Sequence, residues 1–269
     1  MSLAYQTIGD PADSPFVFLH GLGGSASRTT GALNDLRGRF LVAPDLPGHG
    51  ESVDYDPATF GFNQFADHVV ALMDELGIKS TDLGGLSMGS GISLNLALRY
   101  PERVRSLTIL RPSWLDQPRP EHLALVGKVG DWLLAGDPAS ARETLMADPD
   151  FIRLEEANPP MAETVEDLFQ RPAREAYSAV LTRMWNDCPI ASLGELGQID
   201  VSCFVLSCPR DELHPQSVAD AIAGALPDCR TTILPPRYHE PDEYQKELNS
   251  AVSGFLAECG CRANEVPAG

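Results

Sequence analysis

The stretch Gly85-Leu86-Ser87-Met88-Gly89 places one serine between two glycines with the spacing G-x-S-x-G. An apolar run precedes it and a helical pattern follows it. In a sharp turn from a strand to a helix, the serine hydroxyl stands above the sheet, and only very small residues two positions away avoid collision. The N–H groups at the start of the helix would face developing negative charge. The pattern predicts a nucleophilic serine, although a glycine-rich phosphate turn or a plain tight turn has the same spacing.

A serine hydroxyl is a weak nucleophile at neutral pH. It needs a histidine to take its proton and a carboxylate to orient that histidine. The segment Ser207 to Pro215, which follows a late apolar run, contains Asp211, Glu212 and His214, and His239 follows the last such run. The residue types alone do not decide which of the two histidines takes the proton of the serine, or which of the two carboxylates orients that histidine.

The elements that must position these residues alternate along the chain. Apolar runs predict strands, and helical spacing predicts helices. The strands are expected at 16–19, 40–43, 83–86, 104–110, 201–206 and 230–234, and the helices at 63–77, 88–100 and 242–258. This alternation is typical of an α/β fold with a mostly parallel central sheet and helices on both faces. Sites in such sheets collect at the carboxyl ends of strands. His20, Asp45, Ser87 and Asp211 all follow a strand directly.

The alternation stops between Pro112 and about Gln198, where helix-like segments occur without a clear strand. We therefore expect residues 1–111 and 199–269 to form the α/β core and residues 112–198 to form a helical cap inserted over one end of the sheet. Apolar side chains of this cap could line a substrate pocket, although each is better explained as core of the cap. These are Trp114, Trp132, Phe169, Met184 and Trp185.

The bulk composition excludes several classes of partner. The net charge is −18 and the chain has no cluster of Lys or Arg, which argues against binding to nucleic acid or to an anionic membrane surface. Apolar residues make up 43% of the chain, enough for a large core, yet no run is long enough to span a bilayer. No signal-peptide pattern is visible, and the six cysteines are expected to be thiols. These features favour a cytoplasmic protein.

Several motifs together resemble the α/β-hydrolase superfamily, and the resemblance covers nearly the whole chain. His20-Gly21-Leu22-Gly23-Gly24 resembles its oxyanion loop, and Asp45 to Gly50 resembles its D-x-x-G-x-G turn. Gly85 to Gly89 resembles its nucleophile elbow, and the insertion after Leu110 stands where its cap does. The resemblance implies that Ser87 is the nucleophile and that the backbone N–H groups of Leu22 and Met88 form the oxyanion hole.

The resemblance also implies the partners of the serine. His239 stands between the last strand and the last helix, where the superfamily has its catalytic histidine, although Tyr238 precedes it where glycine is common. Asp211 and Pro215 fit the superfamily's D-x-x-x-P pattern, so Asp211 is expected to be the acid. Glu212 remains a second candidate for the acid, and His214 is expected to lie beside the helix that Pro215 opens.

The expected function is hydrolysis of a carboxylic ester or lactone through an acyl-serine intermediate, with no cofactor and no metal. Serine at the elbow argues against the dehalogenases and epoxide hydrolases of the superfamily, which use aspartate there. Because Lys and Arg are sparse, a small, neutral and partly apolar substrate is favoured. A thioesterase, a C–C bond hydrolase, an acyltransferase, or a ligand-binding or signalling protein on the same fold would fit the same motifs.

Overall fold

Seven strands form a single sheet in the order β1-β3-β2-β4-β5-β6-β7 in the computed structural model, which describes residues 2–170 and 174–265. Only β1 runs antiparallel to its neighbour. The strands are β1 Tyr5–Ile8, β2 Ser14–Leu19, β3 Arg39–Pro44, β4 Thr81–Leu86, β5 Val104–Leu110, β6 Ser202–Ser207 and β7 Cys229–Ile233. The mostly parallel sheet expected from the alternating pattern is therefore confirmed.

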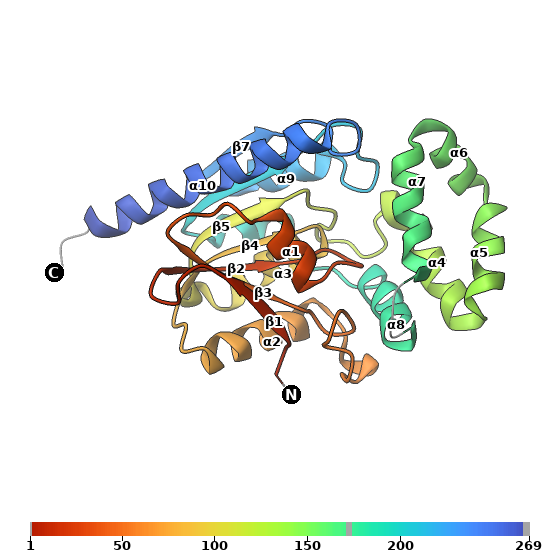
Figure 1. Cartoon of the computed structure of the whole chain (residues 1–269), viewed down its shortest axis with the longest axis horizontal. Helices are drawn as coiled ribbons and strands as arrows, with labels where there is room; N and C mark the ends of the chain where they lie inside the picture. The colour runs from red at the N-terminus through yellow and green to blue at the C-terminus, as the bar shows by residue number, and fades with distance from the viewer. Residues whose placement is uncertain (1, 171–173, 266–269) are drawn as a thin grey trace.

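Ten α-helices are present in the described residues (Figure 1). They are α1 Ala26–Ala32, α2 Phe62–Glu75, α3 Met88–Arg99, α4 Ala124–Ala135, α5 Pro138–Met146, α6 Pro149–Ala157, α7 Pro159–Glu166, α8 Arg174–Trp185, α9 Gln216–Ala225 and α10 Pro241–Glu265. Five of them, α4 to α8, follow one another between β5 and β6, and the described part of this segment contains no strand. None of the helices, as far as they are described, is both long and apolar enough to cross a membrane.

Alternating side chains divide the core between the two faces of the sheet. Phe16 and Phe18 of β2 pack with residues of α10, next to the C-terminal end of α1. Val17 and Leu19, the alternate residues of the same strand, belong to the larger core that includes α2, α3 and α9. Apolar residues of α4 to α8 join this larger core, which therefore continues from the sheet into the helical segment.

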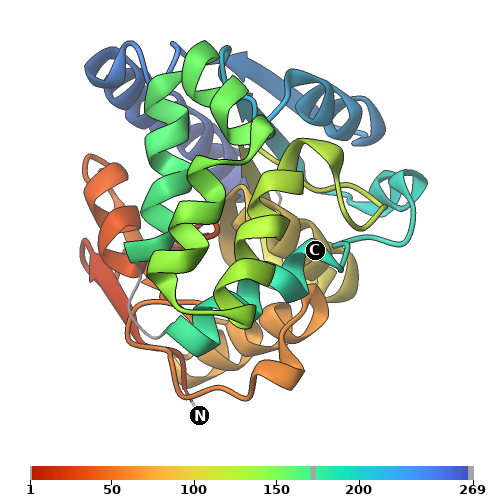
Figure 2. The same cartoon turned by 90° about the vertical axis from the view of Figure 1, so that its right-hand side faces the viewer.

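Helices α4 to α8 lie together at one side of the sheet (Figure 1), and Figure 2 shows them in green in front of it. Thr164 of α7 and Leu168 just after it line a cavity together with Leu86 and Leu110, the last residues of β4 and β5. The helical segment therefore lies next to the carboxyl ends of the parallel strands, where the side chains singled out by the sequence also stand.

Two elements near the N-terminus, β1 and α1, were not predicted from the sequence. Strand β1 is an edge strand whose residues are mostly exposed, so it carries no apolar run. Helix α1 has the sequence ASRTTGA, which lacks a continuous apolar face, and only Ala26 and Thr29 of it are buried. Their formation depends on contacts with β3 and with the Asp45 turn rather than on local pattern.

Candidate active site

Ser87 stands in a strained turn between β4 and α3. Its backbone angles are φ 55° and ψ −113°, which residues other than glycine rarely adopt. A Cβ atom on Gly85 would lie 2.1 Å from the carbonyl oxygen of Gly89, and one on Gly89 would lie 2.2 Å from that of Leu19. Both glycines are therefore sterically required, and the strand-to-helix turn expected from G-x-S-x-G is present.

The loop at residues 20–24 lies directly against this turn, since a Cβ atom on Gly21 would be 3.1 Å from the Cβ of Ser87. His20 anchors the loop. Its Nδ1 is 2.8 Å from the carbonyl oxygen of Gly21, and its Nε2 accepts from the N–H of Leu46 at 3.0 Å. Burial lowers the pKa of His20 to about 4, so the ring is neutral at pH 7 and both nitrogens are occupied structurally.

The Asp45 turn connects this loop to α1. The carboxylate of Asp45 accepts from the N–H of Ala26 at 2.6 Å and from the N–H of Glu51 at 3.0 Å. His49 accepts from the N–H of Gly23 at 3.2 Å through its Nε2. His20 and His49 therefore hold these turns together. Their bonds fix the backbone around Leu22, one of the two expected oxyanion donors.

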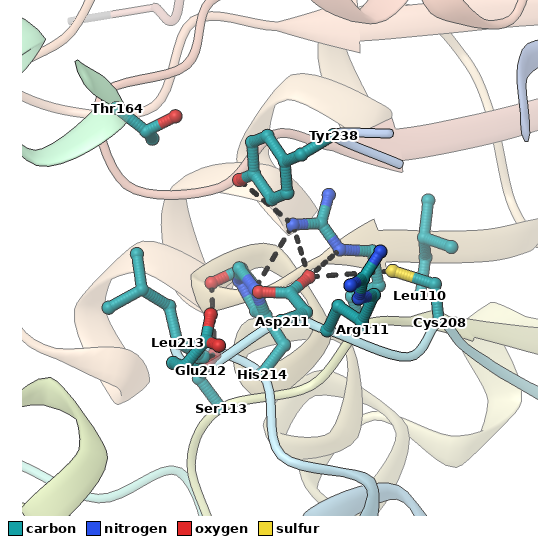
Figure 3. Close-up of polar contacts among 12 residues, drawn as sticks. Leu110, Arg111, Ser113, Thr164, Cys208, Asp211, Glu212, Leu213, His214 and Tyr238 are labelled. Carbon is teal, nitrogen blue, oxygen red and sulfur yellow. Dashed lines mark hydrogen bonds and ion pairs between the residues drawn. The ribbon is translucent and has the colours of Figure 1, made fainter. Parts of the chain in front are cut away.

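The carboxylate of Asp211 is the most enclosed charge near the carboxyl ends of the strands. Its Oδ2 accepts from Arg111 Nε at 2.6 Å, and Arg111 Nη2 lies 2.5 Å from the same atom. Its Oδ1 lies 2.7 Å from His214 Nδ1 (Figure 3). The side chains of Arg111 and Asp211 are 1% and 0% exposed, so the ion pair is shielded from water.

The protonation states around Asp211 follow from burial and charge. Burial favours the neutral acid, but electrostatic attraction to His214 and Arg111 and the hydrogen bonds from both hold the pKa of Asp211 well below its usual value. Burial lowers the pKa of His214 to about 4 despite the nearby carboxylate. A neutral His214 donates its Nδ1 hydrogen to Asp211, which leaves Nε2 unprotonated. The 3.1 Å contact from Arg111 Nη2 to the same Nδ1 is then not a hydrogen bond.

His239 lies apart from this cluster, on the turn between β7 and α10. Its side chain is exposed, and its backbone N–H donates to the carbonyl oxygen of Pro236 at 3.0 Å. The neighbouring Tyr238 points inward instead and accepts from Arg111 Nη2 at 3.3 Å (Figure 3). The expected contact between Asp211 and His239 is not formed in this structure, because Arg111 and His214 take both oxygens of the carboxylate.

Glu212, the second candidate for the acid, is turned away from the ion pair. Its side chain is exposed and accepts from Asn158 Nδ2 at 2.7 Å, at the end of α6. The structure therefore separates two adjacent carboxylates by environment. Asp211 is buried beside Arg111 and His214, whereas Glu212 bonds to the helical segment.

The hydroxyl of Ser87 contacts a residue that the sequence did not single out. Its Oγ lies 3.3 Å from the Oγ of Ser113, which donates to the carbonyl oxygen of Leu213 at 2.8 Å. His122 Nε2 lies 2.8 Å from the carbonyl oxygen of Ser113. Ser113 thus connects the elbow to the segment that carries His214. A serine three residues after a buried strand is too common a feature to have signalled this.

The apolar residues suggested as pocket lining mainly hold the helical segment together. Trp114 is 2% exposed and donates through Nε1 to the carbonyl oxygen of Met184 at 3.1 Å. The ring of Trp185 lies over Gly127, where an added Cβ would be 2.7 Å away. Trp132 and Phe169 are partly buried against the same core.

A cavity of about 370 Å³ lies beside the elbow. Gly21 and Leu22 of the loop line it, together with Leu86 and Leu110 at the ends of β4 and β5. Its other walls come from α1, α7 and the start of α10. The cavity therefore opens next to the backbone on which Ser87 stands and can hold part of a small molecule.

Replacing Arg111 with leucine should destabilise the fold, because the carboxylate of Asp211 would lose its buried counter-charge. Breaking a buried ion pair costs about 3–5 kcal/mol. The paired Asp211 has a lowered pKa, so its stabilising contribution is present above its unfolded pKa and is lost as the pH falls. In Arg111→Leu the pKa of Asp211 rises, so protonation relieves the cost and the deficit should shrink from pH 7 towards pH 4.

Urea unfolding at both pH values measures this deficit. Arg230→Leu is the matched control, because Arg230 pairs with Glu258 at the surface, where both side chains are about half exposed. Arg230→Leu should lower the free energy of unfolding by less than about 1 kcal/mol at either pH. An Arg111→Leu deficit no larger than that of the control would contradict the assigned role of the buried pair.

Comparisons with known proteins were made on the sequence and on the fold. Residues 14–239 match the family model described as "alpha/beta hydrolase fold". The chain is 25% identical over 261 residues to 2-hydroxymuconate semialdehyde hydrolase of Pseudomonas sp. (strain CF600), covering 94% of this chain and 90% of that protein. It is 30% identical over 255 residues to Lipase 1 of Psychrobacter immobilis, covering 89% of this chain and 75% of that protein.

Among solved structures, the fold is similar to that of a thermophilic esterase from Thermogutta terrifontis. The TM-score is 0.76 with 22% sequence identity, and the match covers 96% of this chain and 93% of that one. At this identity the likeness concerns the fold, which extends over both the sheet and the helical segment.

Proposed function

The chain belongs to the alpha/beta hydrolase fold family, and we propose that it is a serine hydrolase that cleaves a carboxylic ester or lactone through an acyl-serine intermediate. The observation that carries the proposal is Ser87 in a strained turn between two sterically required glycines, beside the loop of Gly21. Such a turn exposes a serine hydroxyl above a sheet, next to the start of a helix.

In the proposed reaction, Ser87 Oγ attacks the carbonyl carbon of the substrate while a histidine takes the hydroxyl proton. The carbonyl oxygen becomes an oxyanion that accepts from the backbone N–H groups of Leu22 and Met88. Losing one such donor typically costs about 3 kcal/mol of transition-state stabilisation. The intermediate collapses, and the alcohol leaves with the proton held by the histidine. Water, deprotonated by the same histidine, then releases the acid and restores Ser87.

We propose His239 as that histidine and Asp211 as the acid that orients it. In the structure, Asp211 holds Arg111 and His214 instead, so this assignment requires the turn at 237–240 to move inward. Arg237 and Pro241, on either side of His239, already border the cavity beside the elbow. The proposed active arrangement has the imidazole of His239 at the inner end of this turn.

His214 is a second candidate for the base. Its 2.7 Å contact with Asp211 and its low pKa favour a neutral ring whose Nε2 can accept a proton. A base of this kind would need no movement of the turn at 237–240 to keep its acid partner.

Asp211→Asn should lower turnover by about 10⁴, because an amide stabilises the wrong tautomer of the base and cannot balance its positive charge. Glu212→Gln is the matched control, since it makes the same chemical change at the exposed neighbour. It should leave turnover within a few fold. A larger loss in Glu212→Gln than in Asp211→Asn would assign the acid to Glu212.

A panel of 4-nitrophenyl esters and lactones tests the reaction class. Steady release of many product molecules per enzyme is the expected result. One stoichiometric release followed by tightly held product would favour a ligand-binding role. Turnover of thioesters alone would favour a thioesterase, and cleavage of C–C bonds alone would favour a C–C bond hydrolase. Transfer of the acyl group to an added alcohol in place of water would favour an acyltransferase.

A further inference from the structure

We propose that Asn158, at the junction of α6 and α7, is a positioning residue whose side-chain amide holds the loop 208–214 and so directs the carboxylate of Asp211 inward. The proposal rests on the proposed hydrolase function, in which Asp211 orients the catalytic histidine. The choice of base does not affect this role, because His239 and His214 are both assigned the same acid. The role is also independent of the position of the turn at 237–240.

The side-chain amide of Asn158 binds the chain on both sides of Asp211. Its Nδ2 donates to the carbonyl oxygen of Arg210 at 3.0 Å and to the carboxylate of Glu212 at 2.7 Å. These two bonds use both hydrogens of the amide nitrogen. Asn158 is 2% exposed, so the two bonds are shielded from competing water. One buried group therefore fixes residues 210 and 212 relative to each other, with Asp211 between them.

The backbone of the loop explains why these two bonds direct Asp211. Arg210 has φ 57°, a left-handed conformation that residues other than glycine rarely adopt. Its carbonyl is one of the two groups that Asn158 holds, so the amide helps to retain a conformation that costs energy. The side chain of Glu212 is exposed, whereas that of Asp211 is 0% exposed and points at Arg111 (Figure 3). Neighbouring side chains thus face opposite ways, and fixing the outer one fixes the inner one.

The side chain of Asn158 is not used to cap a helix, although the residue ends α6 and begins α7. Its backbone N–H donates to the carbonyl oxygen of Leu154 at 2.7 Å, and its backbone carbonyl accepts from the N–H of Met161 at 3.0 Å. Asparagine at the start of a helix usually accepts from the first N–H groups through its side chain, but no such bond is formed here. The main chain therefore holds the junction of the two helices, and the amide holds the loop.

The loop 208–214 is held from two sides. Asn158 holds it from the helical segment, and Ser113, just after β5, holds it through a hydrogen bond from its Oγ to the carbonyl oxygen of Leu213 at 2.8 Å. The two bonds of Asn158 are the ones that flank Asp211. Removing the amide of Asn158 therefore loosens the backbone around Asp211 and leaves the Ser113 contact in place.

Asn158→Ala should lower kcat by about 10- to 100-fold, because a loosened loop misplaces Asp211, and a misplacement of about 1 Å can cost about 10² in rate. KM should stay within about twofold of the wild-type value. If Asn158 served only to support α7, which lines the cavity through Thr164, KM would rise and kcat would stay unchanged. Steady-state kinetics with a 4-nitrophenyl ester measure both constants.

Asn95→Ala is the matched control. Asn95 is 5% exposed, and its Nδ2 also makes two bonds, to the Oδ1 of Asn63 at 2.8 Å and to the carbonyl oxygen of Pro189 at 2.7 Å. The substitution removes the same kind of buried amide from α3, so the stability should fall while kcat stays within about twofold. Equal losses of kcat in the two variants, or a kcat of folded Asn158→Ala within about twofold of the wild type, would overturn the proposal.

Glu212 offers a second pair of variants, at an exposed position where neither change removes a buried side chain. Glu212→Gln keeps an oxygen that accepts from Asn158 Nδ2, whereas Glu212→Ala removes that acceptor. We expect kcat of Glu212→Ala to be about threefold or more below that of Glu212→Gln, the effect of one lost hydrogen bond. If Asn158→Ala does not fold, this pair decides, and equal kcat values in the pair then overturn the proposal.

Urea unfolding tests the role of Asn158 without a substrate. Arg111→Leu leaves the carboxylate of Asp211 buried without its counter-charge. In the Asn158→Ala background the loosened loop lets this carboxylate reach water, so the drop in urea midpoint caused by Arg111→Leu should be smaller by about a third or more than in the wild type. In the Asn95→Ala background the drop should equal that in the wild type.

The two readouts separate the role of Asn158 from the hydrolase function. An equal drop in urea midpoint in all three backgrounds overturns the proposed role, even if the wild type hydrolyses esters. A smaller drop in the Asn158→Ala background alone supports that role, and if the wild type then hydrolyses no ester, only the hydrolase function fails.

Discussion

Ser87→Ala should abolish ester hydrolysis, with turnover lowered by at least about 10³ and, if the catalytic residues act as a unit, by up to about 10⁶. Alanine removes only the hydroxyl oxygen, with its 3.3 Å contact to Ser113 Oγ, and keeps the Cβ atom of the turn. The variant should unfold at the same urea concentration as the wild type, because alanine has the same backbone restriction at φ 55°. Release of 4-nitrophenol by the purified variant measures the effect.

Ser113→Ala is the matched control for this prediction. Its hydroxyl lies 3.3 Å from that of Ser87 and is lost in the same way, but it has no bond-forming step in the proposed reaction. We expect it to lower turnover by less than about tenfold. Near-normal turnover by folded Ser87→Ala, or an equal loss in both variants, would remove Ser87 from its assigned role.

His239→Ala should produce the second large loss, also at least about 10³ in turnover, because it removes the group proposed to take the proton from Ser87. The side chain is exposed, so the substitution should leave the free energy of unfolding almost unchanged. His214→Ala should show the opposite pattern. It removes a buried partner of Asp211 and should destabilise the fold, while turnover of the folded variant falls by less than about tenfold.

The comparison of these two histidines decides how the acid is used. A small loss in His239→Ala together with a loss of about 10³ or more in His214→Ala would make the Asp211–His214 contact the catalytic one. The pH dependence of kcat/KM gives an independent reading. An acidic limb near pH 4 would match the low pKa of His214 and would assign the base to that residue.

Much of the sheet was predictable from the sequence, because its inner strands β2 to β6 are mostly buried and largely apolar. The turn at Ser87 was predictable for a steric reason, since only glycine fits at positions 85 and 89. Strand β1 was not predictable, because its residues are mostly exposed and form no apolar run.

The contacts of Asp211 could not be predicted from the sequence, for a different reason. A carboxylate can be paired with any cation that the fold brings near it, and that choice depends on residues about 100 positions apart. Arg111 stood directly after a buried strand, an unusual place for a charge, and this was the one local signal of a buried ion pair.

Labelling with a fluorophosphonate probe shows whether Ser87 is activated, because the probe reacts with an activated serine and requires no knowledge of the substrate. We expect one phosphonyl group per chain, found by mass spectrometry on the peptide that contains Ser87. Ester hydrolysis should be lost in parallel, and Ser87→Ala should remain unlabelled. Folded protein that hydrolyses esters while remaining unlabelled, or that carries the label on a different residue, would contradict the assignment of Ser87 as the nucleophile.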